Sequence, residues 1–558
     1  MTLLSDPKKS HRIVRILDCL FLTGGVITLF YLLTNGIPLI QGGWLHELGK
    51  KSHYTKVTRL VLIGYAIPLF LYYSLARSNF KKLKVVELIR GLAKSRPEIS
   101  AMPLALSFWI TFVIIAFART RAFETRAFDL GIFAQAVWNT LQGHFMYSSL
   151  KGGICLFGDH FSPILLLTVP FYRLWPDPRT LLSLQALATS INIILIFKIA
   201  HQKTKDRGIA LLFAVLYAFF RATRGPLRED FHPEVLAEPF MLGAFLCLEQ
   251  NHVIGFLMAT ALMVLGKENI LGISFILGFY CAIFKKRPWT GIGVAIFSVL
   301  LFLAEIHWWI PAMTGKPYFY QAFYSGSGNP WRWIGRLLTR DSLRYVLTVF
   351  GPLSFLSFFH FSTFLLTFPI LFQNLLSRGD TFRSLSYHYA AGLTPFVLVS
   401  SIYGFDSWRS KSAFVAKHAP CLLGIVAVVF FLQAGPSEYY YLWHIQRHFS
   451  HRKDVLHQEL AKIPPEFSVL THNGVIPHVV NRKNVYQFNY NPVPGKVQQA
   501  AGLKADYVIL GGEFWEPNTE PLAQTRQALI ESGYRIQYQD GDFSILKSKE
   551  ARTVAAAP

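Results

Sequence analysis

Long apolar runs recur along most of this chain, and they constrain its fold more than any other feature. A hydrocarbon core of about 30 Å requires about 20 apolar residues in a helix. Because every backbone amide in lipid must bond within its own segment, these runs predict transmembrane helices. Charged residues make up 16% of the chain, which is below the roughly 25% of soluble proteins. We therefore predict an α-helical polytopic membrane protein with about thirteen spans. The spans lie near 17–35, 57–76, 101–119, 181–200, 208–223, 235–250, 252–265, 270–284, 290–310, 342–357, 360–376, 388–404 and 413–433.

Lysine and arginine clusters in the connections indicate how the spans are oriented. Five clusters fall on one side of the membrane in this assignment, at 8–15, 81–96, 203–207, 285–287 and 409–411. By the positive-inside rule that side is cytoplasmic, so we expect a multi-pass protein of the cell (inner or plasma) membrane with a cytoplasmic N-terminus. Anionic membrane lipids then explain the formal net charge of +23, and we expect no nucleic acid as a partner.

One apolar run does not fit this scheme. Residues 161–175 contain two prolines and are too short for a span. If the run were a span, the basic clusters that follow it would lie on the opposite side of the membrane from the earlier ones. We therefore predict an interfacial or re-entrant helix on the outer side. The loops that then face outward are 120–180, 224–234, 266–269, 311–341 and 377–387.

The composition changes near His451, where polar residues return between short β-type runs. Strands are predicted at 467–471, 484–488, 505–510, 534–539 and 543–546, and a helix at 520–532. An Asp-Gly turn joins the last two strands as a hairpin. We divide the chain into an N-terminal two-span extension with a basic cytoplasmic segment (1–100), a transmembrane domain (101–435) and a small α/β extracytoplasmic domain (450–550).

Polar side chains gather in the predicted outer loops, and the first group surrounds Asp129. Apolar residues repeat at helical spacing from Leu130 to Leu141, whereas Gln135 and Asn139 lie elsewhere on the helical wheel. This pattern predicts an amphipathic helix at the outer membrane surface. Asp129, at its start, either caps the helix or acts as a general base.

Asp159 and His160 form a second group, directly before the apolar run at 161–175. Such a pair is either simply solvated, or it orients a catalytic group or binds a divalent cation such as Mg²⁺ or Mn²⁺. Two ligands do not specify a metal, and the sequence requires no cofactor. The five cysteines show no zinc-binding spacing.

A third group lies in the loop 224–234. Arg224 and Arg228 suit a phosphate head group. His232 and Glu234 stand at the head of a span, where an ionisable residue is costly and therefore a candidate for function. Ordinary snorkelling to the interface is the alternative.

Two smaller groups complete the set of candidate residues. Lys267 and Glu268 form a charged turn between two apolar runs, in which they either neutralise each other or leave Lys267 to bind phosphate. His388 and Tyr389 lie at the outer end of a late span, either as interfacial anchors or as substrate-binding residues.

These groups resemble a family of uncharacterised membrane proteins of bacteria and archaea that is placed in the GT-C glycosyltransferase superfamily. The resemblance covers roughly residues 100–510. It is carried by FDLGIFAQAVWNTLQG, GDHFSPILLLTVPFYRLWPDPRTLLSLQA, DFHPEVLAEPF, GKEN and YHYAAGLTPF, and by IPPEFSVLTHNGVIPHVVNRKNVYQF in the C-terminal part.

The resemblance implies a GT-C-like enzyme that moves a sugar from a polyprenyl-phosphate carrier to an acceptor on the outer side. Such enzymes hold a catalytic aspartate in the first long outer loop, beside two juxtamembrane helices. Asp129 matches that position, with 128–142 and 161–175 as the two helices. In the superfamily this loop usually follows the first span, whereas two extra spans precede it here.

The hypothesis assigns roles to the candidate residues. Asp129 would take the proton of the acceptor hydroxyl, and Arg224, Arg228 or Lys267 would neutralise the phosphate leaving group. Glu234 or His232 would orient the sugar or the base.

Two other functions stay open. A transporter or flippase for lipid-linked or polar substrates would need a polar path through the bilayer and, often, two related halves. The third hypothesis is a non-catalytic envelope assembly factor, with the C-terminal domain as its binding module.

Overall fold

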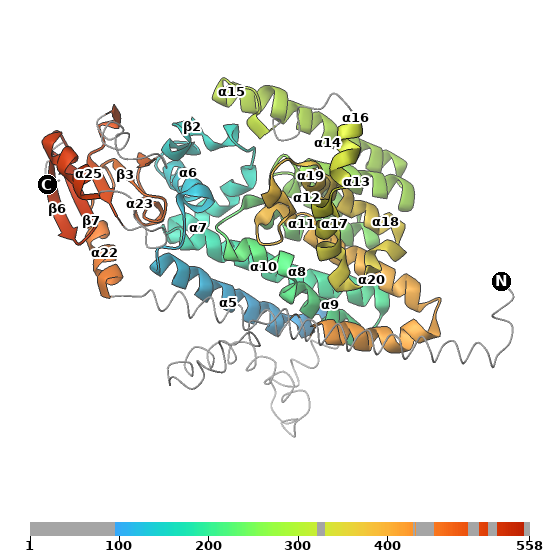
Figure 1. The fold of residues 1–558 in the computed structure, drawn as a ribbon. Helices are drawn as coiled ribbons and strands as arrows, with labels where there is room; N and C mark the ends of the chain where they lie inside the picture. The colour runs from blue at the N-terminus through green and yellow to red at the C-terminus, as the bar shows by residue number, and fades with distance from the viewer. Residues whose placement is uncertain are drawn as a thin grey trace, which may run out of the picture.

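The computed structural model describes residues 95–320, 330–427, 430, 451–488, 502–511 and 522–551. The predicted spans 17–35 and 57–76 and the end of the span 413–433 lie outside the described residues. In Figure 1 the C-terminal strands lie at one side of a helical bundle, next to α6 (Ile132–Leu141) and α7 (Val169–Leu174).

Most helices of the bundle follow the predicted apolar runs, and helices also form at 221–228, 310–314 and 330–337, which fall largely in the predicted outer loops 224–234 and 311–341. The helices are α5 (Met102–Arg121), α8 (Arg179–Thr204), α9 (Arg207–Phe219), α10 (Arg221–Arg228), α11 (Pro233–Glu249), α12 (Val253–Met263), α13 (Ile270–Phe284), α14 (Pro288–Ala304), α15 (Ile310–Thr314), α16 (Pro330–Leu337), α17 (Arg340–Phe350), α18 (Phe361–Phe364), α19 (Phe368–Leu376), α20 (Thr394–Arg409) and the helix Ala413–Ala427. Four stretches of the described chain are long and apolar enough to cross a membrane: Pro97–Arg121, Arg179–Thr204, Arg207–Arg228 and Pro288–Thr314. The total of thirteen spans stays a prediction.

Two predicted spans, 342–357 and 360–376, are not continuous α-helices. α17 ends at Phe350, where Pro352 lacks the N–H that an α-helix needs. Ser354 and Phe355 then adopt left-handed φ angles of 53° and 54°, which an α-helix of L-residues does not contain. Short 3-10 turns replace the expected helix, and a further 3-10 turn separates α18 from α19.

The outer segment 120–180 contains α6 and α7. The run predicted not to span forms a 3-10 turn, η6 (Pro163–Thr168), followed by α7. Together they cover Pro163–Leu174, which is shorter than a span. Several of its apolar side chains stay exposed, as expected for an interfacial helix; they are Leu166, Leu167, Phe171 and Leu174.

The expectation of a surface-lying α6 is wrong, because both of its faces are buried. Gln135 and Asn139 are fully buried. The Gln135 Nε2 donates to the Ser149 hydroxyl at 2.8 Å and to the Lys483 carbonyl at 3.0 Å. Residues more than 340 positions later in the chain thus cover the face that was expected to lie at the membrane surface.

All five predicted C-terminal strands are present and form one sheet in the order β4-β3-β5-β7-β6. The strands are β3 (Val469–Thr471), β4 (Val485–Gln487), β5 (Tyr507–Leu510), β6 (Tyr534–Asp540) and β7 (Phe543–Ser548). β3 is parallel to β4 and β5, whereas β7 is antiparallel to β5 and β6. Successive residues point to opposite faces, so α22 (His451–Ala461) packs on the face of Val469 and Ile509, and α25 (Leu522–Glu531) packs on the face of Leu470 and Val508.

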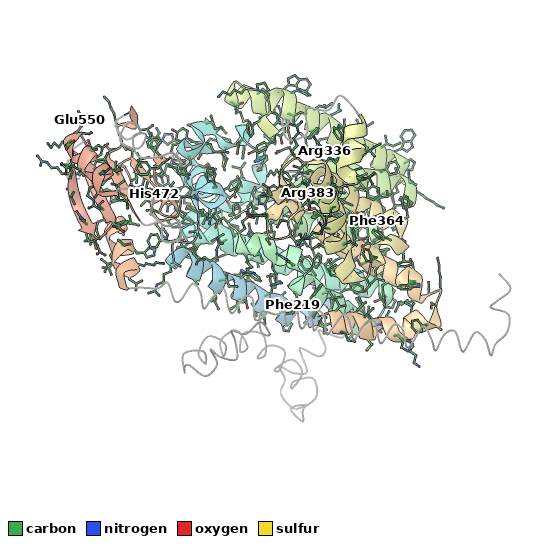
Figure 2. All side chains as sticks on the ribbon, viewed as in Figure 1. Phe219, Arg336, Phe364, Arg383, His472 and Glu550 are labelled. Atoms are coloured by element: carbon green, nitrogen blue, oxygen red, sulfur yellow. The ribbon has the colours of Figure 1, made fainter. Side chains whose placement is uncertain are left out.

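The sheet unit packs directly on the outer segment. Ile476, Val480 and Val485 share a hydrophobic core with Leu130 and Phe133 of the Asp129 region. In Figure 2, His472 marks this junction between the C-terminal strands and the outer segment. The C-terminal unit is therefore part of the scaffold that holds the Asp129 loop.

A candidate active site in a charged cavity

The outer-loop groups converge on a cavity of about 1110 Å³. All predicted site residues except Arg224 and Arg228 line it: Asp129, Asp159, His160, His232, Glu234, Lys267, Glu268, His388 and Tyr389. They come from five separate segments of the chain. The packing of the helices therefore brings together residues that are up to 260 positions apart.

Asp129 lies in η3 (Ala127–Gly131), a π-turn that leads into α6. Its φ of 68° and ψ of −82° are rare for a residue with a side chain and cost about 1–3 kcal/mol. Among the described residues, the start of α6 has no capping hydrogen bond from a side chain. The structure therefore does not support the alternative that Asp129 merely caps the helix, and its half-buried side chain faces the cavity instead.

The backbone before this aspartate is held from two sides. The Arg126 N–H donates to Asp230 Oδ2 at 2.8 Å, and the buried Asp230 also pairs with Arg119 at 3.0 Å. On the other side, the Ala127 N–H donates to the Asn473 Oδ1 at 2.8 Å. Burial raises the pKa of Asp230 to about 6, although the positive charge of Arg119 opposes that shift. A strained conformation persists only when its surroundings hold it in place, as they do here.

Glu229, His232 and His388 form a compact cluster in the cavity wall. Glu229 Oε2 lies 3.2 Å from His232 Nε2 and 3.1 Å from His388 Nδ1, and the two imidazole rings stack with centroids 3.8 Å apart. Burial raises the pKa of Glu229, but the two histidines outweigh burial and hold this pKa well below its usual range.

Gly225 allows the chain segment before His388 to pack closely against the helix that precedes the His232 loop. The backbone of Leu385 and Ser386 lies directly on Gly225, and a Cβ there would overlap the Leu385 carbonyl oxygen. The missing side chain thus permits a close approach that no other residue would allow.

Lys267 and Glu268 enter the cavity side by side but have different partners. The Lys267 Nζ lies 3.6 Å from Glu234 Oε1. Glu268 Oε1 accepts hydrogen bonds from Tyr318 at 2.5 Å and lies 2.6 Å from His160 Nδ1. Burial opposes the charge on Lys267, but the neighbouring carboxylates outweigh it and raise the pKa of Lys267. Burial raises the pKa of Glu268, but His160 and its other partners lower it to about 2.

Asp159 and His160 both line the cavity but have different partners within the protein. The Asp159 Oδ2 lies 2.8 Å from Lys151 Nζ, and its Oδ1 accepts from the Tyr320 hydroxyl at 3.4 Å. The Tyr320 ring stacks on His160, with centroids 4.1 Å apart. Among the described residues, the side chains that come together as a group of three metal ligands are Glu229, His232 and His388, and not the Asp159–His160 pair.

Arg224 and Arg228, predicted to bind phosphate, are not among the residues that line the cavity. α10 turns Arg224 into the protein interior, where its Nε donates to the Phe219 carbonyl. Lys151 lies in the cavity instead, together with Tyr318 and Tyr320. No spacing in the sequence marks Lys151, and the two tyrosines lie in the predicted outer loop 311–341.

The cavity has two chemically distinct parts. The ionisable groups occupy one part, and apolar side chains from α13, α14 and α19 line the other. The apolar lining includes Phe275, Val299, Phe302 and Ile370, together with Ile306 from the π-turn Glu305–Trp309 that follows α14. The span that contains α14 buries only 22% of its most apolar window, so the apolar part lies beside a helix whose surface remains available to lipid.

The charges of the lining residues do not balance. Five carboxylates line the cavity, those of Asp129, Asp159, Glu229, Glu234 and Glu268, but only two lysines do, Lys151 and Lys267. With the three histidines neutral, the lining carries an excess of three negative charges. An unmatched buried charge is costly, so a bound cation or protonated imidazole is expected to compensate.

A bundle of apolar helices with a charged cavity at one end defines a membrane protein. A family described as "Predicted membrane protein (DUF2079)" matches residues 119–547, and the chain belongs to this family. Solved structures that are similar to the chain include two of ArnT. ArnT from Cupriavidus metallidurans bound to undecaprenyl phosphate is 11% identical, over 78% of this chain and 97% of that chain, with a TM-score of 0.49. ArnT from the same organism in the apo state is 13% identical over the same shares, with a TM-score of 0.46. No curated protein matches the chain.

Proposed function

We propose that the protein is a GT-C-type glycosyltransferase that moves a sugar from a polyprenyl-phosphate-linked donor to an acceptor on the extracytoplasmic side of the cell membrane. The two-part cavity carries this proposal. Ionisable groups around Asp129 and Lys267 adjoin an apolar slot between α13, α14 and α19. A lipid-linked sugar phosphate has the same two parts, a charged head and an apolar tail.

The proposed reaction is a single displacement at the anomeric carbon of the donor sugar. Asp129 takes the proton of the acceptor hydroxyl while its oxygen attacks that carbon. The bond from the anomeric carbon to the phosphate oxygen breaks, polyprenyl phosphate leaves, and the configuration inverts. Lys267 and Lys151 stabilise the charge that develops on the leaving phosphate. Glu234 positions Lys267, and His232 and Glu268 position the sugar and the base.

The two alternatives have less support from the described residues. A flippase moves its substrate through the bilayer and needs polar groups along the path, whereas the lining residues from the spans around this cavity are mostly apolar. An assembly factor needs no strained carboxylate, yet Asp129 is held in a costly conformation.

The test is to offer the purified full-length chain, reconstituted in liposomes, a panel of polyprenyl-phosphate sugars together with candidate acceptors. Release of free polyprenyl phosphate is the readout, because it does not depend on which sugar is accepted. We expect release with at least one donor. Movement of a fluorescent donor between leaflets without any release would instead favour a flippase.

A labelling experiment tests the orientation on which the proposal depends. Single cysteines are introduced at Phe145 in the outer segment and at Lys286 in a basic cluster, both exposed, in a background without the native cysteines. A membrane-impermeant maleimide should label Phe145→Cys in intact cells, and Lys286→Cys only after lysis. The opposite pattern would place Asp129 in the cytosol and refute the proposed reaction.

A further inference from the structure

The cluster of Glu229, His232 and His388 has the composition and the geometry of a metal site. Its three candidate ligand atoms, one per residue, lie within 4.8 Å of one another. Two imidazoles and one carboxylate make up a ligand set that zinc enzymes use, with a fourth position left for water or substrate. Two nitrogen ligands also favour zinc and related transition metals over Mg²⁺, which prefers oxygen.

The distances agree with coordination by one ion. A tetrahedral zinc ion with bonds of about 2.0–2.1 Å holds its ligand atoms about 3.3 Å apart. Glu229 Oε2 lies 3.2 Å from His232 Nε2 and 3.1 Å from His388 Nδ1. Both distances from Glu229 therefore fit a shared ion, and the stacked imidazole rings must rotate so that both ring nitrogens point to it.

His232 supplies an independent observation. The residue is only 2% exposed, and its Nε2 has no well-aligned hydrogen bond among the described residues, although Glu229 lies at ion-pair distance. A buried ring nitrogen without a hydrogen bond is costly unless it binds something else. All three residues line the cavity, so an ion held by them would face it.

Neighbouring groups hold the ligands in position, as they do around known metal ions. The His388 backbone N–H donates to Glu229 Oε2 at 3.0 Å, and Arg119 donates to the Glu229 carbonyl. The second nitrogen of His388 lies 3.8 Å from Glu234 Oε1, in the arrangement of a carboxylate behind a ligating histidine.

The excess of carboxylates in the lining provides the electrostatic reason for a cation. With the three histidines neutral, a phosphate that enters this cavity meets three more negative charges than positive ones. Two lysines, each already paired with a carboxylate, do not offset that repulsion. A divalent cation removes most of the excess and leaves a coordination position for a phosphate oxygen.

We propose that Glu229, His232 and His388 bind one divalent transition-metal ion of the zinc class, which presents an open coordination position to the cavity. The role of this ion in binding the donor phosphate rests on the proposed glycosyltransferase function. The site itself does not depend on that function.

Metal content tests the site directly. The full-length protein in detergent is stripped with a chelator, dialysed against ZnCl₂, passed through a desalting column and analysed by elemental mass spectrometry. We expect about one zinc ion per chain, and loss of most of it in both Glu229→Gln and His388→Gln. His360→Gln is the matched control, because His360 hydrogen-bonds to Thr363 and does not line the cavity; this variant should keep its zinc.

Cobalt gives a second readout that does not depend on the stability of a variant. Co²⁺ bound by the unaltered protein should show the visible absorption of a four-coordinate nitrogen–oxygen site, and zinc should displace it. A wild-type protein without stoichiometric zinc, or folded Glu229→Gln and His388→Gln variants with full zinc content, would overturn the proposal. Zinc binding without sugar transfer would refute the proposed function alone, whereas transfer by the fully stripped protein would refute the metal's role in donor binding.

Discussion

The two ends of the helical bundle are both rich in ionisable side chains, but they pair them differently. At the basic end, formed by residues 203–207, 249, 285–287 and 406–411, Asp406 and Glu249 are each paired with a cation, and Asp206 caps α9. Asp406 lies 2.8 Å from Arg409 and 3.5 Å from Lys203, and Glu249 lies 2.8 Å from Lys285. At the cavity end, five carboxylates share two lysines and three histidines.

The two ends therefore differ in the kind of environment that their charged side chains suit. The pairs at the basic end are partly exposed and leave a surplus of positive charge, which suits contact with anionic lipid. The cavity pairs of Glu234 and Glu268 are more deeply buried, and the surplus of the lining is negative when its histidines are neutral. Burial of unmatched charge lowers stability, and the proposed binding of a charged ligand would offset that cost at the cavity end.

Replacing Asp129 should have the largest effect of any change at either end. For Asp129→Asn we expect the rate of polyprenyl phosphate release to fall about 10²- to 10⁴-fold, because the general base is lost. Asparagine tolerates a positive φ, so the fold should be kept. Initial rates in liposomes and gel filtration measure the two effects. Asp406→Asn at the basic end is the matched control, and a fully active, folded Asp129→Asn would exclude this residue as the base.

Removing the positive charge of Lys267 in the cavity should lower the stability of the fold more than removing a lysine at the basic end. Lys267→Met leaves Glu234 buried without its cation, so we expect a loss of about 3–5 kcal/mol in the free energy of unfolding. Thermal unfolding in detergent measures it. Lys267→Arg keeps the charge and should recover most of the loss. If Lys267→Met unfolds at the same temperature as the wild type, the loss of a charge in the cavity lowers stability no more than the loss of a charge at the surface.

The C-terminal unit should influence the cavity through Asn473. Asn473→Ala removes the Oδ1 that accepts from the Ala127 N–H but keeps the Asn473 carbonyl, which accepts from the same N–H at 3.0 Å, so we expect a cost below about 1 kcal/mol. Because Asp129 lies two residues further on, we expect kcat to fall while KM for the donor changes little. Asn484→Ala is the control, since Asn484 accepts from Tyr147 in the same interface but away from Asp129. Equal kcat in both variants would show that the contact does not position the base.

The smallest effect is expected at the basic end. Lys203→Met removes one partly exposed partner of Asp406, which keeps Arg409. We expect a change in stability below about 1 kcal/mol and an unchanged rate of release. The same unfolding and activity measurements check this. A loss as large as that of Lys267→Met would erase the contrast between the two ends.

Local patterns in the sequence predicted much of this molecule. Hydropathy indicated the positions of the helices, and alternation indicated all five strands of the C-terminal sheet. The groups at Asp129, His160, Lys267 and His388 were identified because ionisable residues are costly beside apolar spans. The division into domains at 1–100, 101–435 and 450–550 stays a prediction, as do the orientation and the number of spans.

The sequence by itself determined which segments are helices and strands and which loops carry ionisable groups, because hydropathy and backbone hydrogen bonding act within short stretches of chain. Only the tertiary structure decided which of these groups meet. It turned Arg224 away from the cavity, brought Lys151 into it, placed His388 against His232, and packed the C-terminal sheet on α6. Such contacts join residues more than a hundred positions apart and depend on how helices pack, which a local pattern does not encode.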